Sequence, residues 1–247
     1  FSVTSGTIFA HHKLPLRVYL GAVALYTNAV KGLSALQMCR DLGVQYKTAF
    51  VLMHKVREGL MAQREETPLC GEVEVDGAYV GGHVRPRNKK EDRLDRRLAE
   101  NQSPDKRCIL ILRENQADVA TLTQRFIAPA TVISADESDA YDLLHARFAM
   151  RRVNHQVEYR ADDGTTNNQA ESYFSRFRRM EIGQTHKFGI RYLANYAHEA
   201  AYREDTRRQS NGEIFRDILT KCAHTPTHRD WCGYWQGNKR LQERLAA

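Results

Sequence analysis

The sequence predicts a mixed α/β domain preceded by a small all-helical region. Up to about residue 65, apolar residues recur only at helical spacing. After residue 70, short runs of β-forming residues alternate with helical segments, and two of those runs end in an aspartate. A chain of 247 residues can bury one sizeable core and carry a small accessory domain. We therefore expect a helical region over 1–65, an α/β domain over 70–208 and a helical tail over 209–247.

The overall composition indicates a globular protein with a polyanionic partner. Lysine and arginine number 37 against 30 aspartate and glutamate residues, which gives a net charge of +7 and a pI of about 9.2. Such an excess of positive charge favours nucleic acid as the partner. The sequence has no run of about 18 apolar residues, so we expect no membrane-spanning helix and no membrane partner.

The cysteines are spaced too far apart to indicate a shared site. There are five of them, and no C-x-x-C pair is present. This spacing argues against a zinc knuckle and against a disulfide framework, so we expect free thiols in a reducing cytoplasm. The first residues, Phe1 to Ser5, contain neither an initiator methionine nor a signal-peptide pattern, so we expect the natural chain to begin further upstream.

Within the helical region, two short helices flank a turn. Residues 13–30 form a first apolar run with Pro15 near its start. Ser34, followed three residues later by Gln37, fits a capping box for a helix that ends at Gly43. A further helix follows directly, with one apolar side made of Phe50, Met53, Val56 and Leu60. This arrangement fits a helix-turn-helix motif.

The start of the second helix in such a motif contacts base edges or phosphates. Here that start consists of Gln45, Tyr46, Lys47 and Thr48. An ordinary helical hairpin that packs on its neighbour explains the pattern about equally well. Lys55 and Arg57, later in the same helix, favour DNA binding.

The segment 83–107 is strongly charged and lacks an apolar period long enough for a packed element. It holds nine Lys/Arg residues against five Asp/Glu residues, together with two prolines. We expect a basic insertion loop in which Arg85, Arg87, Lys89 and Lys90 follow DNA phosphates. A solvated surface loop without a partner is the alternative.

The α/β domain is expected to alternate strands and helices. The expected strands cover 73–80, 108–112, 131–136 and, more weakly, 153–159. The expected helices cover 118–126, 138–148, 168–182 and 190–208, with one more around 215–219. An initial antiparallel part followed by this mixed order suits an RNase H-like topology.

Two aspartates stand at strand ends in this order. Taken alone, Asp76 is more simply a solvent-facing acid on a half-buried strand. In an RNase H-like fold, however, the ends of the first and fourth strands lie side by side, which would bring Asp76 and Asp136 together. A later polar helix then supplies Asn168 or Glu171 as a third oxygen ligand, although Asn168 is also a good helix N-cap. Mg²⁺ and Mn²⁺ prefer oxygen ligands, and two such ions can serve phosphodiester cleavage.

Several segments resemble the ISXO2-like, IS1595-family bacterial transposases. The most specific of them is Val73-Glu74-Val75-Asp76-Gly77-Ala78-Tyr79-Val80-Gly81-Gly82. The others, in the same order as in the family, are Phe1-Ser2-Val3-Thr4-Ser5-Gly6-Thr7, Leu33-Ser34-Ala35-Leu36-Gln37, Tyr46-Lys47-Thr48-Ala49, Ala135-Asp136-Glu137, Asn168-Gln169-Ala170-Glu171, Gly183-Gln184-Thr185-His186 and Tyr202-Arg203-Glu204-Asp205. The resemblance thus covers nearly the whole chain.

The resemblance implies a DDE-type DNA transposase, which is a metal-dependent polynucleotidyl transferase with an RNase H-like core and two bound Mg²⁺ or Mn²⁺ ions. It also implies binding to the terminal inverted repeats of an insertion sequence, strand cleavage and transfer of the 3′ end into target DNA. A homo-oligomer on paired ends, in the bacterial cytoplasm and associated with the nucleoid, follows from the same family pattern.

By position, the resemblance implies that Asp76 and Asp136 are the two catalytic aspartates. Members of the family read Asp-Asp-Asn or Asp-Asp-Glu, and we favour Asn168 over Glu171 as the third ligand. The downstream lysine of the family falls at Arg178 here, and an arginine can hold a DNA phosphate. The chain departs from its relatives in two ways: it begins after the zinc ribbon that they usually carry, and glycine follows Asp76 where many have glutamate.

Three further expectations stay open at this point. His186 and Lys187 lie in a loop between helices, where they contact DNA, support the metal site or form only a polar turn. Glu199 and Arg203, four residues apart on one helix, are expected to form a structural ion pair. The alternative functions are a non-catalytic, domesticated DNA-binding protein and an RNase H-like nuclease that cleaves DNA without joining it.

Overall fold

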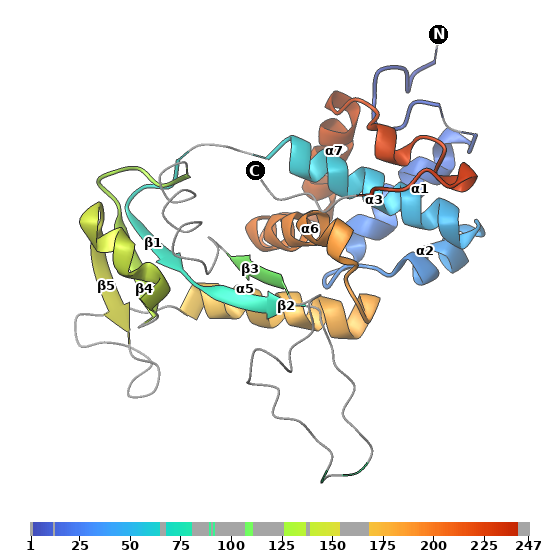
Figure 1. Cartoon of the computed structure of the whole chain (residues 1–247). Coiled ribbons are helices and arrows are strands. Elements are labelled where there is room, and N and C mark those ends of the chain that lie inside the picture. Colours follow the sequence, from blue (N-terminus) through green and yellow to red (C-terminus); the bar gives the residue numbers. More distant parts are fainter. Residues whose placement is uncertain are drawn as a thin grey trace. The chain divides into compact units, whose positions relative to one another are not determined.

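The structure is a computed structural model of the chain (Figure 1). It describes residues 2–11, 13–64, 68–80, 89, 91, 107–110, 126–136, 139–153 and 168–241. These fall into two compact units, one formed by Phe1–Glu65 with Arg176–Ala247 and the other by Glu66–Ser175. The mixed α/β class predicted from the sequence is confirmed. The three predicted domain ranges stay a prediction.

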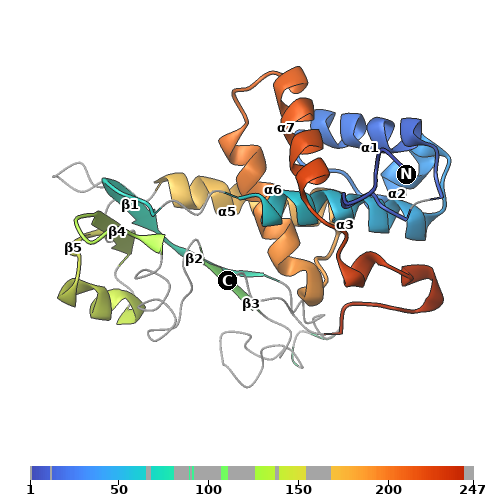
Figure 2. The same cartoon turned by 90° about the horizontal axis from the view of Figure 1, so that it is seen from above.

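The first unit is helical and draws its helices from both ends of the chain. Its main helices are α1 (Leu16–Asn28), α2 (Ala35–Leu42), α3 (Tyr46–Ala62), α6 (Leu193–Asp205) and α7 (Asn211–His224). Helix α3 packs against α2, α6 and α7, and α7 also packs against α1 (Figure 2). The apolar core formed in this way includes Val23, Met53 and Ile218, each at most 1% exposed.

The boundaries of the first helices follow local sequence signals. Pro15 is the N-cap of α1, and the Ser34 hydroxyl accepts a hydrogen bond from the backbone N–H of Gln37 at 3.1 Å. The side chain of Gln37 donates to Asp41 instead of returning to the N-cap, so this half of the predicted capping box is wrong. Gly43 ends α2 in the left-handed conformation, with a φ of 63°, which glycine adopts without a steric penalty.

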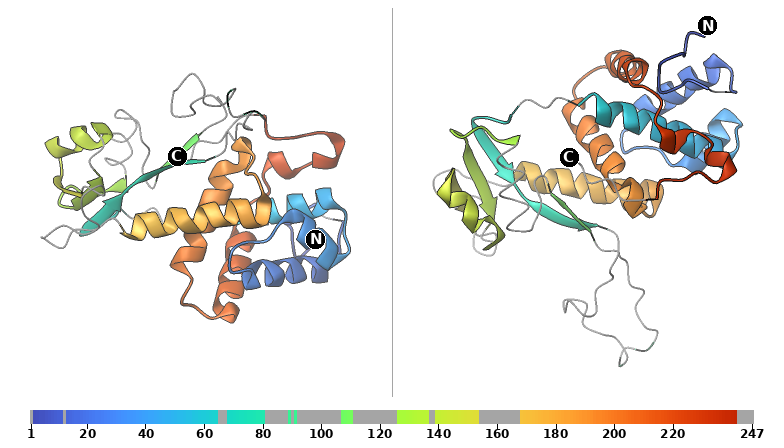
Figure 3. Two further views of the ribbon diagram at one scale, coloured as in Figure 1. Left: turned by 90° about the horizontal axis from the view of Figure 1, so that it is seen from below. Right: turned by 45° about the horizontal axis from the view of Figure 1, so that its top comes forward.

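The second unit contains two small sheets. Strand β1 (Glu72–Val75) runs parallel to β4 (Val132–Asp136), which in turn runs parallel to β5 (Ala149–Val153). Strand β2 (Gly77–Val80) pairs in antiparallel fashion with β3 (Arg107–Leu110). Only Asp76 separates β1 from β2, so one extended segment contributes to both sheets, as Figure 3 shows.

A short apolar core supports the parallel sheet. It includes Val75, Ile133 and Ala135 from the strands and Tyr141 and Leu144 from the segment between β4 and β5. That segment, Asp139–Ala146, is a 3₁₀ helix, so the predicted helix over 138–148 is present, although it is shorter. In a 3₁₀ helix residues three apart lie on the same side, which directs both Tyr141 and Leu144 into the core.

Strand β5 begins earlier than predicted. The sequence pattern favoured 153–159, whereas the strand is Ala149–Val153, and residues 154–159 lie outside the described residues. Phe148 is buried and adds to the core just before the strand, and the parallel pairing with β4 then starts at Ala149. The two consecutive arginines in this strand hid its β character in the sequence.

Helix α5 (Asn168–Met180) follows, close to the predicted 168–182. It continues into one π-helical turn, Glu181–Thr185, and a 3₁₀ turn, Ile190–Tyr192, precedes α6. Of the predicted helix over 118–126, only Phe126 is described. Within the described ranges, none of the helices has both the length and the apolar character needed to cross a membrane. The four cysteines whose side chains are described are free thiols: Cys39, Cys70, Cys222 and Cys232.

Candidate active site

The strand register places the two predicted aspartates at one end of neighbouring strands. The last aligned pair of β1 and β4 is Val75 with Ala135. Asp76 and Asp136 each follow directly, at the carboxyl ends of these parallel strands. Because neighbouring strands lie about 4.8 Å apart, the backbones of the two aspartates come close together. Asp136 also pairs with Val153 of β5, which places it on the central strand of the sheet.

Asp76 occupies the position where its strand exchanges partners. Before it the chain pairs with β4, and after it the chain pairs with β3. The side chain of Asp76 is half-buried, and its Oδ1 accepts a hydrogen bond from the backbone N–H of Gly77 at 2.7 Å. The short strands on both sides hold the backbone of Asp76, which makes it a stiff platform for a ligand.

The remaining predicted catalytic residues lie along one helix. Asn168 is the first residue of α5, Glu171 lies exposed in its first turn, and Arg178 lies exposed in its last turn. A direct contact ties the start of this helix to the strand that leads to Asp76. The Glu74 Oε2 accepts hydrogen bonds from the backbone N–H groups of Gln169 at 2.8 Å and of Ala170 at 3.0 Å.

The hydrogen bonds of Glu74 to α5 were not predicted from the sequence. The sequence signal for an outward-facing Glu74 is the alternation of acids with valines along β1. Val73 and Val75 belong to the core of the unit, so Glu74 leaves the strand on the other side. Nothing near Glu74 in the sequence indicates its partner, because the helix start lies 95 residues further along the chain.

The donor set fits a hard divalent cation. Asp76, Asp136, Asn168 and Glu171 offer carboxylate and amide oxygens, which Mg²⁺ and Mn²⁺ prefer. The strand register brings the backbones of Asp76 and Asp136 to one end of the sheet. Asn168 and Glu171 lie at the start of α5, which Glu74 connects to the same sheet by hydrogen bonds. Among the side chains that the structure describes, no three His, Cys, Asp or Glu residues gather in a group that could hold a metal. Of Asp136 and Asn168, the structure describes the position of the backbone only.

The predicted DNA-reading residues lie at the start of α3. Gln45 is the N-cap residue, Tyr46 and Lys47 are exposed, and Thr48 is half-buried. These positions are open to a partner on the surface of the first unit.

Lys55 and Arg57, which favoured DNA binding in the sequence, do not belong to that surface. Both are buried, and the Arg57 Nε lies 2.6 Å from the Glu199 Oε2. Burial lowers the pKa of Lys55. The interpretation was wrong because Arg57 forms an ion pair with Glu199, which lies 142 residues further along the chain. The periodicity of α3 contains no information about such a distant partner.

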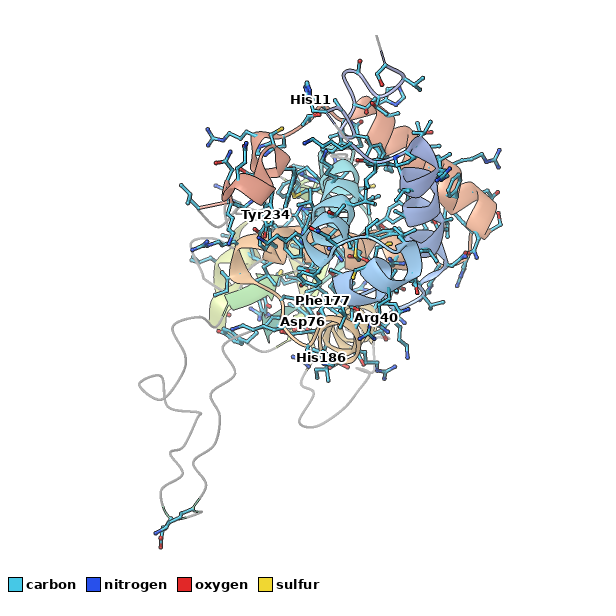
Figure 4. The ribbon with its side chains drawn as sticks, turned by 90° about the vertical axis from the view of Figure 1, so that its right-hand side faces the viewer. His11, Arg40, Asp76, Phe177, His186 and Tyr234 are labelled. Atoms are coloured by element: carbon cyan, nitrogen blue, oxygen red, sulfur yellow. The ribbon has the colours of Figure 1, made fainter. Side chains whose placement is uncertain are left out.

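The other predicted DNA contacts are only partly described. In the basic loop, Lys89 is exposed and its Nζ lies 3.8 Å from Glu91 Oε1, while Arg85, Arg87 and Lys90 lie outside the described residues. His186, labelled in Figure 4, is exposed and ends the π-helical turn with a φ of 58°. Lys187 beside it is exposed as well.

Comparison with known proteins identifies the family of the chain. Neither the curated proteins nor the solved structures yield a match. A family model described as the ISXO2-like transposase domain matches residues 68–205, which is more than half of the chain. The matched range contains both strand-end aspartates and helix α5. The chain therefore belongs to the ISXO2-like transposase family of the IS1595 group.

Proposed function

We propose that the protein is a metal-dependent DNA transposase, which binds the ends of an insertion sequence, cleaves a DNA strand there and joins the 3′ end to target DNA. The observation that carries this proposal is the register of β1 and β4, in which Asp76 and Asp136 follow one aligned pair of residues. Two carboxylates brought together at this end of the sheet would repel each other unless a cation lay between them. Membership in a transposase family supports the same chemistry.

The proposed site consists of Asp76 and Asp136 together with a third oxygen ligand from the start of α5. We favour Asn168 in this role and keep Glu171 as the alternative. A pair of Mg²⁺ or Mn²⁺ ions, when bound, activates the attacking oxygen and stabilises the leaving oxygen of an in-line phosphoryl transfer. The chain itself orients these ligands, because the sheet holds the aspartates and Glu74 holds the helix.

The proposed fold of the catalytic domain is RNase H-like. The strand pairings support it: β3 lies antiparallel beside β2, while β1, β4 and β5 follow one another in parallel. In this topology the first strand is long and pairs on both sides, as the β1–β2 segment does around Asp76. A helix that follows the sheet then meets the strand ends, which is the role we assign to α5.

DNA contacts are proposed on both units. Helices α2 and α3 would act as a helix-turn-helix, with Gln45, Tyr46, Lys47 and Thr48 facing the terminal repeats. Arg178, His186, Lys187 and the basic segment 83–107 would contact phosphates of the element end or of target DNA. The net charge of +7 supports a polyanionic partner. By analogy with the family pattern, we propose a homo-oligomer on paired ends in the bacterial cytoplasm, near the nucleoid.

A strand-transfer assay tests the proposal. Labelled element-end DNA is incubated with the protein, a target plasmid and either Mg²⁺ or Mn²⁺, and joined products are separated on a gel. Asp76→Ala should lower the rate at least about 100-fold, since even residues that only support metal ligands contribute about 10–100-fold. DNA binding, measured by a mobility shift, should stay unchanged.

The matched control for Asp76→Ala is Glu72→Ala, which removes an acid from the strand that leads to Asp76. Glu72 is exposed and pairs with Arg151 at 3.0 Å, so its loss should leave strand transfer intact. Cleavage without joined product would favour the nuclease, and binding without cleavage would favour a non-catalytic DNA-binding protein. If Asp76→Ala lost DNA binding as well, the role of Asp76 would be structural.

The third ligand is tested by a pair of variants in the same assay. Asn168→Ala should abolish strand transfer, whereas Glu171→Ala should retain most of it. The reverse outcome would identify Glu171 as the third ligand, and the net charge of the ligands would then be −3 instead of −2.

A further inference from the structure

The contact between Glu74 and α5 has the form of a helix cap supplied from a distant strand. The first backbone N–H groups of a helix lack partners within the helix, and an N-cap side chain usually accepts from the second or third of them. With α5 starting at Asn168, those two donors belong to Gln169 and Ala170. The Glu74 Oε2 accepts from both, at 2.8 Å and 3.0 Å.

The charge of Glu74 suits this position. A carboxylate is favoured at the positive N-terminal end of a helix dipole, and hydrogen bonds to an ionised acceptor are stronger than those to a neutral one. Glu74 comes two residues before Asp76 on the same extended segment. The same side chain therefore connects the strand of one predicted ligand to the helix of the other two.

We propose that Glu74 is a positioning residue of the active site. It fixes the start of α5 relative to β1, and so sets the spacing between Asp76 and the third ligand. This inference rests on the proposed function for its consequence, whereas the cap itself can be tested without any activity.

The first measurement is hydrogen exchange of backbone amides. Glu74→Ala removes the acceptor, so the amides at the start of α5 should exchange about 5- to 30-fold faster, as expected when a cap is lost. Glu74→Gln keeps an oxygen acceptor without the charge and should exchange at an intermediate rate. Glu72→Ala, which removes the neighbouring exposed acid, should leave these amides unchanged. Equal exchange in Glu74→Ala and the wild type would overturn the cap.

The second measurement is Mn²⁺ binding by calorimetry, followed by strand transfer as a function of Mn²⁺ concentration. Glu74→Ala should weaken Mn²⁺ binding about 10–100-fold, which is the usual loss when a residue that orients a ligand is removed. Glu74→Gln should recover part of that loss, and element-end binding should be the same in all variants. Faster exchange combined with wild-type Mn²⁺ binding would show that the cap serves the fold alone and would overturn the positioning role.

The two arms also separate this inference from the proposed function. A wild-type protein that neither binds Mn²⁺ nor transfers strands would refute the proposed function, and the positioning role of Glu74 with it. The exchange measurement would still decide whether Glu74 caps α5.

Discussion

At the scale of single residues, the first unit contains a cluster of charged side chains around the buried Glu199. Glu199 is fully buried, and its carboxylate lies 2.6 Å from Arg57 and 2.8 Å from Arg203. The predicted pair of Glu199 with Arg203 is thus confirmed, with Arg57 as an additional partner. Burial by itself would raise the pKa of Glu199, but the two guanidinium groups lower it. The carboxylate therefore stays ionised, which makes the arrangement dependent on all three members.

We expect Glu199→Ala to lower the free energy of unfolding by about 3–5 kcal/mol, because it leaves the buried Arg57 and the half-buried Arg203 without their counter-charge. Urea denaturation followed by circular dichroism measures the change. Glu204→Ala is the control, since its partners Arg176 and Arg207 are both exposed, and it should cost less than about 1 kcal/mol. Similar losses in both variants would contradict this account of the buried pair.

His54 is a second buried polar residue in the same unit. Its ring stacks on Trp231 with 5.1 Å between centroids, and neither ring nitrogen has a hydrogen-bond partner within the described part of the chain. Burial lowers the pKa of His54 well below its usual value, and the nearby Arg57 and Arg240 lower it further. Burial, with Arg64 nearby, also lowers the pKa of His198 to about 4. Both rings are therefore neutral in the folded protein near neutral pH.

Stability should fall as the pH drops below about 6.5, the usual pKa of histidine in an unfolded chain. In that range the unfolded state binds protons that the folded state excludes, so the free energy of unfolding rises with pH. Urea midpoints at pH 7.5 and pH 5.5 measure the loss. His54→Phe should show a smaller difference between the two pH values than the wild type. An unchanged difference would exclude His54 as a source of the acid sensitivity.

The sequence allowed some of these residues to be predicted and hid others. The strand-end positions of Asp76 and Asp136 could be predicted because each aspartate closes a run of β-forming residues, and the parallel register of β1 and β4 then aligns them. The capping role of Glu74 and the burial of Arg57 depend on partners 95 and 142 residues away, which local periodicity does not contain. Both residues are held by contacts between segments that are far apart in the sequence.

At the scale of elements, the first turn of helix α3 and its middle have different surroundings. Its first turn carries Lys47 on the surface, whereas its middle carries Lys55 and Arg57 in the core. The helices themselves were predictable from apolar spacing, and the ends of α2 from Ser34 and Gly43. The 3₁₀ type of the helix Asp139–Ala146 was not predictable, because the spacing of its apolar residues fits either type of helix.

The two lysines of α3 give a matched test of DNA contact. Lys47→Ala should weaken binding to element ends and lower the slope of log affinity against log salt by about 1, as the loss of one phosphate contact does. Lys55→Met should leave this slope unchanged, because a buried lysine releases no counterion on binding. Fluorescence anisotropy at several salt concentrations provides the slopes. An equal effect of both substitutions would contradict the proposed DNA surface.

At the scale of the whole molecule, the first unit joins the two ends of the chain. Helix α7 contributes Ile218 and Cys222 to the same core as Val23 and Met53 from the N-terminal helices. Helices α3 and α7 approach closely at Gly59, where an added Cβ would lie 3.0 Å from the Cys222 Sγ and 3.3 Å from its Cα. This glycine allows the two helices to pack together.

Two glycines in helices should therefore respond oppositely to alanine. Gly212 lies in α7 with open space around it, so Gly212→Ala should stabilise the protein by about 0.5–1 kcal/mol through helix propensity. Gly59→Ala should destabilise it, because overpacking costs about 1–3 kcal/mol and one of the opposing atoms belongs to the backbone. Urea denaturation measures both changes.

Combining Gly59→Ala with Cys222→Ala removes the closest opposing atom, so the double variant should lose less stability than the sum of the single ones. Additive losses would mean that α7 does not press on α3 at this point. The N-terminal helices would then owe less to the C-terminal part of the chain, as an independent helical region over 1–65 requires. A coupled result would instead make the N-terminal helices depend for their stability on α7, a helix from the other end of the chain.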